Sequence, residues 1–153
     1  MELSSIEREI YVEASPGVVF EVVSRPEHVR RWWPDEAHHD PAPGSTGHIV
    51  FGAGTDGRAE VAFTVVDAEP PRTFSFRWTQ PEGEPAAEGN SLLVTFDLTP
   101  SRGGTLLRMT ETGFREMGWE IALLEEQYRE HGEGWDFYLP RLVTYVDSLM
   151  ARP

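Results

Sequence analysis

The sequence contains no cysteine, which excludes disulfide bonds, thiolate nucleophiles and cysteine-bound zinc. It also lacks a run of about eighteen apolar residues, the length that a membrane-spanning helix needs. The opening residues, MELSSIEREI, have neither the basic flank nor the apolar stretch of a secretion signal. Basic residues are few, since 13 stand against 26 acidic ones and the net charge is −13. Nucleic acids and anionic lipid surfaces need basic patches, so we expect a soluble cytoplasmic protein with neither as partner.

The length and the C-terminal part of the sequence indicate one domain that ends in a long amphipathic helix. At 153 residues the chain is expected to form a single domain over residues 1–153, large enough to bury a core. Between 131 and 150 apolar residues recur every three or four positions, which places them on one face of a helix. Glycines punctuate its start, so we predict a closing helix from about Gly132 to Met150 and a separate helical insert over 117–131. Pro140, on the polar side, is expected to kink this helix.

Much of the remaining sequence alternates between apolar and polar residues, as strands with one solvated face do. The first such run covers 6–13, and two short helices are predicted after it, from Pro16 and over 27–33. Five more strands are predicted at 47–51, 58–69, 73–79, 91–99 and 105–113, whereas 35–45 and 80–90 have the composition of loops. Short connections between the later strands favour an antiparallel meander. The sequence therefore predicts an α+β domain with a curved six-stranded antiparallel sheet around the C-terminal helix.

A glycine-rich stretch matches the spacing of a dinucleotide-binding loop. Residues 52–57 read Gly-Ala-Gly-Thr-Asp-Gly and follow a predicted strand. The dinucleotide fingerprint also needs a helix that opens at this point, so that its N-terminus meets the pyrophosphate. A strand pattern follows instead, and Asp-Gly is a favoured hairpin pair. We interpret the stretch as a turn.

The run His38-His39-Asp40 invites a metal-site interpretation. Adjacent residues of an extended segment point to opposite sides, and no third ligand stands at a telling spacing. The other histidines, His28, His48 and His131, are scattered along the chain. We therefore expect no metal and no cofactor.

Glu111 is the polar residue with the strongest claim to a special role. In the run Thr105, Leu107, Met109, Glu111 it shares the face of the apolar positions. A carboxyl group that points inward needs a buried partner or has a raised pKa. The alternative, which we favour, is that Glu111 lies near the strand end and reaches water or Arg8. Known nucleophile-elbow and metalloprotease motifs do not occur, so we assign no catalytic residue.

The sequence as a whole resembles a known family. The resemblance rests on five segments: 10–20 (IYVEASPGVVF), the pair Trp32-Trp33, EPPR at 69–72 with the aromatic residues that follow it, 104–110, and GEGW at 132–135 with the predicted helix that follows it. In this order they resemble the START-like (SRPBCC, Bet v 1-like) superfamily, in its branch related to the C-terminal domain of the activator of Hsp90 ATPase. The resemblance implies a helix-grip fold with a cavity between sheet and helix. The 117–131 insert and Pro140 depart from the pattern.

Superfamily members bind lipids, sterols, polyketides and other apolar molecules, and some catalyse cyclisation or hydrolysis. The first hypothesis is thus a binding protein for a small apolar or amphipathic molecule. A cyclase, aromatase or hydrolase that uses the same cavity is the alternative, and a chaperone-interacting module ranks third, because the chain has no room for the activator's further N-terminal domain. A homodimer is left open.

Binding ranks above catalysis because catalysis needs a positioned acid or base and only Glu111 is a candidate. The cavity lining follows from strand parity and helix facing. It is predicted to consist of Trp33, Phe51, Phe63, Phe76, Trp78, Phe96, Met109, Glu111, Tyr138 and Leu142.

Overall fold

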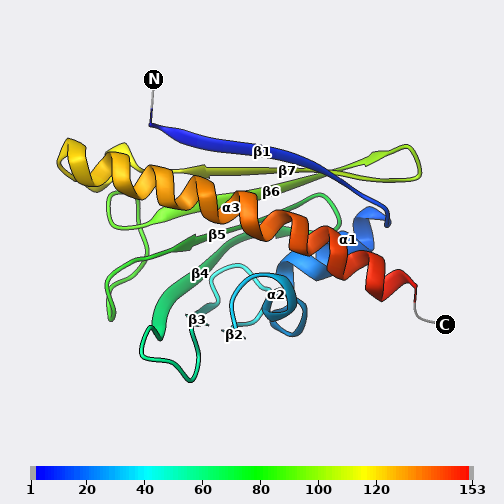
Figure 1. The fold of residues 1–153 in the computed structure, drawn as a ribbon, viewed down its shortest axis with the longest axis horizontal. Coiled ribbons are helices and arrows are strands. Elements are labelled where there is room, and N and C mark those ends of the chain that lie inside the picture. Colours follow the sequence, from blue (N-terminus) through cyan, green and yellow to red (C-terminus); the bar gives the residue numbers. More distant parts are fainter. Residues whose placement is uncertain (1–2, 152–153) are drawn as a thin grey trace.

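The computed structural model describes residues 3–151. The chain forms β1 (Ser5–Val12), α1 (Pro16–Ser24), α2 (Pro26–Trp32), β2 (Glu36–His38), β3 (Thr46–Phe51), β4 (Ala59–Glu69), β5 (Thr73–Trp78), β6 (Leu92–Ser101), β7 (Gly104–Thr112), the short 3-10 helix η1 (Arg115–Met117) and α3 (Ile121–Met150). Figure 1 shows α3 lying across one face of the sheet, with α1 and α2 beside its C-terminal half. This is the predicted α+β arrangement.

Within residues 3–151 the sheet has seven strands in the order β1-β7-β6-β5-β4-β3-β2, and every neighbouring pair is antiparallel. The prediction of six strands is wrong, because β2 lies inside the 35–45 stretch that was expected to be a loop. Its three residues pair with β3, from Glu36 opposite Val50 to His38 opposite His48. So short a strand, next to prolines and charges, carries no alternation to detect, and only the pairing with β3 defines it.

Helix α3 runs without a break through Gly132, so the prediction of an insert and a separate closing helix is wrong. Gly132 is buried, and a Cβ on it would lie 3.4 Å from Nη2 of Arg8 and 4.0 Å from Cδ1 of Ile6. These are ordinary van der Waals distances, so α3 packs against β1 at this point. Tyr128 donates a hydrogen bond of 2.6 Å to the carbonyl oxygen of Ser5 on the same strand. This packing offsets the ~1 kcal/mol that glycine costs inside a helix.

Pro140 also lies inside α3, and its exposed side chain is on the predicted polar face. The carbonyl group that loses its helical donor there can bond to water instead. The hydroxyl of Thr144 donates to the carbonyl oxygen of Pro140 over 3.2 Å. Helix α3 therefore tolerates the proline because it falls on the side away from the sheet.

The first two helices begin as their sequences predict. The Oγ of Ser15 accepts a hydrogen bond of 3.3 Å from the backbone N–H of Val18, and Pro16 occupies the first turn of α1. Helix α2 begins with Pro26 and ends at Trp32, and Trp33 follows it directly; both tryptophans are buried. Trp32 donates its indole N–H to the carbonyl oxygen of Val22 over 3.0 Å, which joins α2 to α1.

The core lies between the sheet and the inner face of α3. On α3 the buried residues Trp135, Leu139, Leu142 and Val146 follow the helical spacing of the sequence. The sheet contributes a continuous layer of buried aromatic rings from β4, β5 and β6: Phe63, Phe74, Phe76, Trp78 and Phe96. Among the helices of residues 3–151, none has the length and apolarity that crossing a membrane demands.

Candidate ligand pocket

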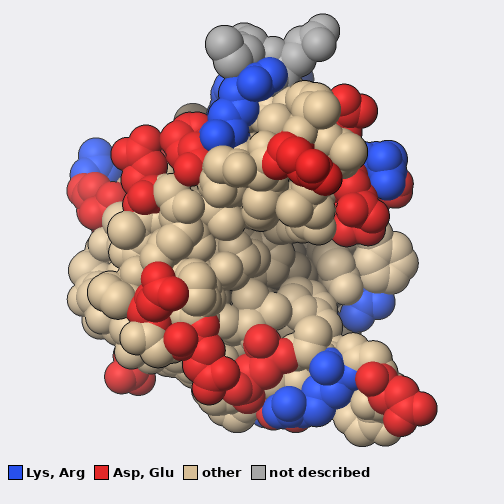
Figure 2. Space-filling model, turned by 90° about the vertical axis from the view of Figure 1, so that its left-hand side faces the viewer, with Lys and Arg blue, Asp and Glu red and all other residues tan. Residues whose placement is uncertain are grey.

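A pocket of about 410 Å³ opens where α3 faces the ends of β3 and β5. Five aromatic side chains form most of its wall, and the remainder comes from one turn of α3. The lining residues are Trp33, Phe51, Trp78, Glu130, His131, Gly134, Trp135 and Tyr138. Figure 2 shows the end of the molecule near the start of α3, which has a hollow walled by uncharged residues and bordered by acidic side chains. The pocket is thus apolar inside with an acidic surround.

Trp33 is the centre of the aromatic wall. It follows α2 directly, and its backbone N–H donates to the carbonyl oxygen of Val29 over 3.0 Å. Its ring centroid lies 5.0 Å from that of Trp78, 5.2 Å from Trp135 and 6.0 Å from Phe51. Tilted and edge-to-face contacts at such distances are the preferred geometries of aromatic pairs. Helix α2 therefore supplies the ring that connects the sheet side of the pocket to the α3 side.

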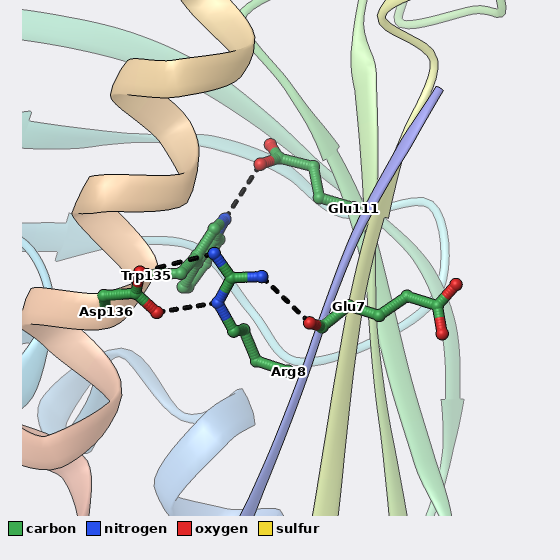
Figure 3. Close-up of polar contacts among 5 residues, drawn as sticks. All are labelled: Glu7, Arg8, Glu111, Trp135 and Asp136. Carbon is green, nitrogen blue, oxygen red and sulfur yellow. Dashed lines mark hydrogen bonds and ion pairs between the residues drawn. The ribbon is translucent and has the colours of Figure 1, made fainter. Parts of the chain in front are cut away.

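Beneath these rings lies the carboxyl group of Glu111, which is fully buried. The indole N–H of Trp78 donates to its Oε2 and that of Trp135 to its Oε1, each over 2.8 Å. Nδ1 of His131 lies 3.1 Å from both oxygens. Figure 3 shows Glu111 and Trp135 pointing toward each other between β7 and α3. The expectation that Glu111 reaches water or Arg8 is wrong, and its partners come from β5 and from two successive turns of α3.

Arg8 instead pairs with α3. Its Nε lies 2.6 Å from Oδ1 of Asp136, its Nη2 lies 3.3 Å from Oδ2, and its Nη1 donates to the carbonyl oxygen of Glu7 over 3.0 Å (Figure 3). The two side chains are 35% and 62% exposed, so the pair is worth at most ~1 kcal/mol. Strand parity does not separate the two charged residues, because Arg8 stands opposite Met109 and Glu111 opposite Ile6, which places both on the inner face of the sheet. Arg8 is long enough to turn out to the solvated side of α3.

His131 is a residue of the pocket that the sequence analysis did not select. It projects from α3 one turn before Trp135, its side chain is 14% exposed, and its ring lies 5.2 Å from Trp78 and 5.5 Å from Phe114. A signal was present in the sequence, because His131 and Trp135 stand four residues apart on the apolar side of a helix and both carry N–H donors. Such donors are what an inward-facing Glu111 requires.

The ten predicted lining residues divide into two groups. Trp33, Phe51, Trp78 and Tyr138 line the pocket. The other six are buried in the core around it: Phe63, Phe76, Phe96, Met109, Glu111 and Leu142. Parity assigns a residue to a face of the sheet but not to a depth, and the rings of Phe63 and Phe76 stack at 4.3 Å with no room between them. Glu130, His131, Gly134 and Trp135 join the lining although they were not on the predicted list.

The two motifs that the sequence singled out lie elsewhere. Residues 52–57 form a turn, with Thr55 donating its hydroxyl to the carbonyl oxygen of Gly52 over 2.6 Å, and β4 rather than a helix follows. The adjacent histidines separate as expected: His39 binds the carbonyl oxygen of Ser24 over 2.8 Å, while the ring of His38 lies 4.7 Å from that of His48. Burial lowers the pKa of His39 below its ordinary value of 6.5. No group of three or more candidate metal ligands occurs within residues 3–151.

A second and larger pocket, of about 700 Å³, lies along β3 and β4 beneath the segment that follows β5. Its lining is more polar and includes His48, Glu60, Gln80, Glu82 and Glu84. Because it lacks the aromatic wall, it is a poorer match to the usual composition of a small-molecule site.

Several solved structures share this architecture. The protein MLL2253 from Mesorhizobium loti is 23% identical with a TM-score of 0.75, over 94% of this chain and 97% of that one. The protein NE0264 from Nitrosomonas europaea is 15% identical with a TM-score of 0.77, over 99% of both chains. The Aha1 dimer from Colwellia psychrerythraea is 18% identical with a TM-score of 0.71, over 93% of this chain and 95% of that one. At such identities the likeness establishes the fold alone.

The family follows from the sequence match. Residues 13–147 match the family described as Activator of Hsp90 ATPase homolog 1-like protein, and the chain belongs to this family. The match begins at the end of β1 and reaches the last turn of α3, so it includes every residue of the pocket. No curated protein matches the chain.

Proposed function

We propose that this protein binds a small, largely apolar molecule in the pocket between α3 and the ends of β3 and β5. The observation that carries the proposal is an open pocket of about 410 Å³ walled by five aromatic side chains, with the His131–Glu111 pair at its base. Apolar walls with few polar groups are the usual composition of a ligand site. The fold agrees with this function, because START-like domains hold ligands between the sheet and the C-terminal helix.

The pocket lies nearer the surface than the sequence suggested. Phe63, Phe76, Phe96, Met109 and Leu142 are at most 1% exposed, and they support the wall from behind. The ligand would thus contact the four predicted rings Trp33, Phe51, Trp78 and Tyr138, together with Trp135. The proposal includes a cytoplasmic location, with which a cysteine-free sequence is compatible.

A reaction in the same pocket is the second candidate, and one observation favours it. His131 stands between the pocket and a buried carboxylate, as a general base stands beside the group that orients it. A cyclase or hydrolase would use such a pair. Interaction with a chaperone ranks third, and a homodimer is a further possibility that the solution structure of the Colwellia Aha1 dimer suggests. Light scattering in solution measures the size of the assembly.

Gly134 offers a direct test of the pocket. It lies in α3 on the pocket wall, and a Cβ added there would meet no atom within 4 Å. Gly134→Leu should therefore fill the pocket without straining the fold. The matched control is Glu133→Leu, which adds the same side chain at an exposed position one residue away.

The assay is a titration of each variant with Nile red, a neutral apolar dye whose emission rises in apolar surroundings. We expect saturable binding by the wild type and by Glu133→Leu, and a loss of at least about tenfold in affinity for Gly134→Leu, since the volume that holds the dye is gone. Circular dichroism confirms that the variants are folded. Equal binding by all three proteins would show that the dye binds elsewhere and would remove the support for this pocket.

A further inference from the structure

The hydrogen bonds around Glu111 determine which atoms His131 presents to the pocket. The indole nitrogens of Trp78 and Trp135 can only donate, and each already bonds one oxygen of the carboxyl group. The ionised carboxylate has only acceptors, so Nδ1 of His131, the third nitrogen that approaches it, carries a hydrogen and donates when Glu111 is in this form. Three N–H donors around one buried carboxylate compensate the cost of removing its charge from water.

With Nδ1 committed to Glu111, the other ring nitrogen of His131 is available to a ligand. Nε2 lies across the imidazole ring from Nδ1, on the side away from the carboxylate, and the ring lines the pocket. Within residues 3–151 no hydrogen bond to Nε2 is found, and the atom is not sealed off from solvent. In the neutral imidazole this nitrogen is an acceptor, and in the imidazolium it is a donor.

The charges at the pocket select among the polar groups that a ligand could present to Nε2. Glu130 lines the pocket from the same turn of α3, Glu111 lies beneath it, and the whole sequence carries a charge of −13. A ligand carboxylate would meet like charges there. An ammonium group could pair with Glu130 and with the aromatic faces, but the imidazolium form of His131 would repel it. A neutral ligand group with an acidic hydrogen avoids both penalties.

We infer that the ligand is an aromatic or similarly apolar molecule with a weakly acidic hydroxyl group, a phenol or an enol, that bonds to Nε2 of His131. The inference rests on the proposed function and specifies its ligand class. A hydroxyl of this kind suits both states of the ring. It donates O–H to the neutral imidazole, and if its proton moves to Nε2, the resulting oxyanion accepts N–H from the imidazolium, which Glu111 stabilises. One proton then moves between two atoms, and no other bond changes.

The test compares four probes that share one body and differ in the polar group: 4-propylphenol, 4-propylanisole, 4-propylbenzoate and 4-propylbenzylamine. Isothermal titration calorimetry gives the affinity of each for the wild-type protein. We expect the phenol to bind about three- to tenfold more tightly than the anisole, the advantage of one hydrogen bond to an otherwise unpaired acceptor. The benzoate should be the weakest. Equal affinity of phenol and anisole, or tightest binding by the amine or the benzoate, would overturn the inference.

A substitution then assigns the preference to Nε2. His131→Asn retains an N–H donor near the position of Nδ1 for Glu111 but has no atom in place of Nε2. The phenol preference should disappear in this variant and persist in the control His48→Asn, whose histidine lies on β3 outside the pocket. A preference that survives in His131→Asn would assign the hydroxyl to another acceptor, such as Tyr138, and contradict the inference.

The same experiment separates this inference from the proposed function. If all four probes bind the wild type with similar affinity and Gly134→Leu abolishes binding, the pocket binds apolar molecules and only the hydroxyl assignment fails. If none of them binds, the proposed function itself fails. Should His131→Asn not fold, the comparison of phenol with anisole in the wild type still decides the ligand class.

Discussion

Trp135 combines two contributions to stability that substitution can separate. Its side chain is 2% exposed, its ring contacts Trp33, Trp78 and Phe96 at centroid distances of 5.2, 6.5 and 6.2 Å, and its N–H donates to Glu111. Removing a buried aromatic ring costs ~3–5 kcal/mol of unfolding free energy. Removing only the N–H leaves one oxygen of a buried carboxylate with a single donor, which costs ~1–3 kcal/mol.

Trp135→Ala should therefore lose ~4–8 kcal/mol, and Trp135→Phe should lose ~1–4 kcal/mol, because a phenyl ring fills most of the space but cannot donate. Single domains are typically stable by ~5–15 kcal/mol, so the alanine variant will be marginal. Urea unfolding followed by circular dichroism measures both. At a slope of about 2 kcal/mol per molar, a loss of 4 kcal/mol lowers the midpoint by about 2 M.

Phe137→Ala is the matched control, since Phe137 lies two residues away on α3 but is 59% exposed. We expect it to cost less than ~1 kcal/mol. A loss below about 1 kcal/mol for Trp135→Ala would refute the placement of the ring in the core. Equal stability of Trp135→Phe and the wild type would show that the hydrogen bond to Glu111 contributes nothing.

Four further outcomes are expected. Burial lowers the pKa of His39 below 6.5, so around that pH the unfolded chain binds more protons at this residue than the folded protein does. The free energy of unfolding should therefore fall as the pH drops from about 7.5 to about 5.5. Urea midpoints measured at each pH should fall less steeply for His39→Gln than for the wild type. Gly47→Ala should be severely destabilising in the same assay, since its Cβ would lie 1.9 Å from the carbonyl oxygen of His38. Gly134→Ala, with open space at its Cβ, should raise stability by up to ~1 kcal/mol in urea melts. Met109→Trp should cost ~1–3 kcal/mol by overpacking, because Met109 is fully buried, and a neutral effect would reveal spare volume beneath the pocket.

The order of the elements could be predicted because each has a local cause. Alternation over 6–13 and the later runs gave the strands, Ser15 with Pro16 gave the start of α1, and the spacing of Trp135, Leu139 and Leu142 gave the inner face of α3. The residues of the aromatic wall on the sheet followed from the same parity. The family resemblance agreed with these patterns and is confirmed by the match over residues 13–147.

Where prediction failed, the deciding interaction joined residues far apart in the sequence. A strand of three residues exists because β3 pairs with it, and α3 continues through Gly132 while Tyr128, one turn earlier, bonds to β1. The depth of the pocket depends on the curvature of the sheet and on the position that Trp33 takes after α2. No pattern among neighbouring residues in the sequence predicts either of them.

What the sequence by itself determined, then, is the fold class and the strand face that Glu111 shares with Leu107 and Met109, since periodicity and parity are properties of neighbouring residues. Only the tertiary structure decided that Glu111 meets Trp78, His131 and Trp135, and that the pocket opens beside them. The four side chains come from β5, β7 and α3, and the two most distant, Trp78 and Trp135, are 57 residues apart in the sequence. The physical reason is that a buried carboxylate requires donors but does not specify from which part of the chain they come.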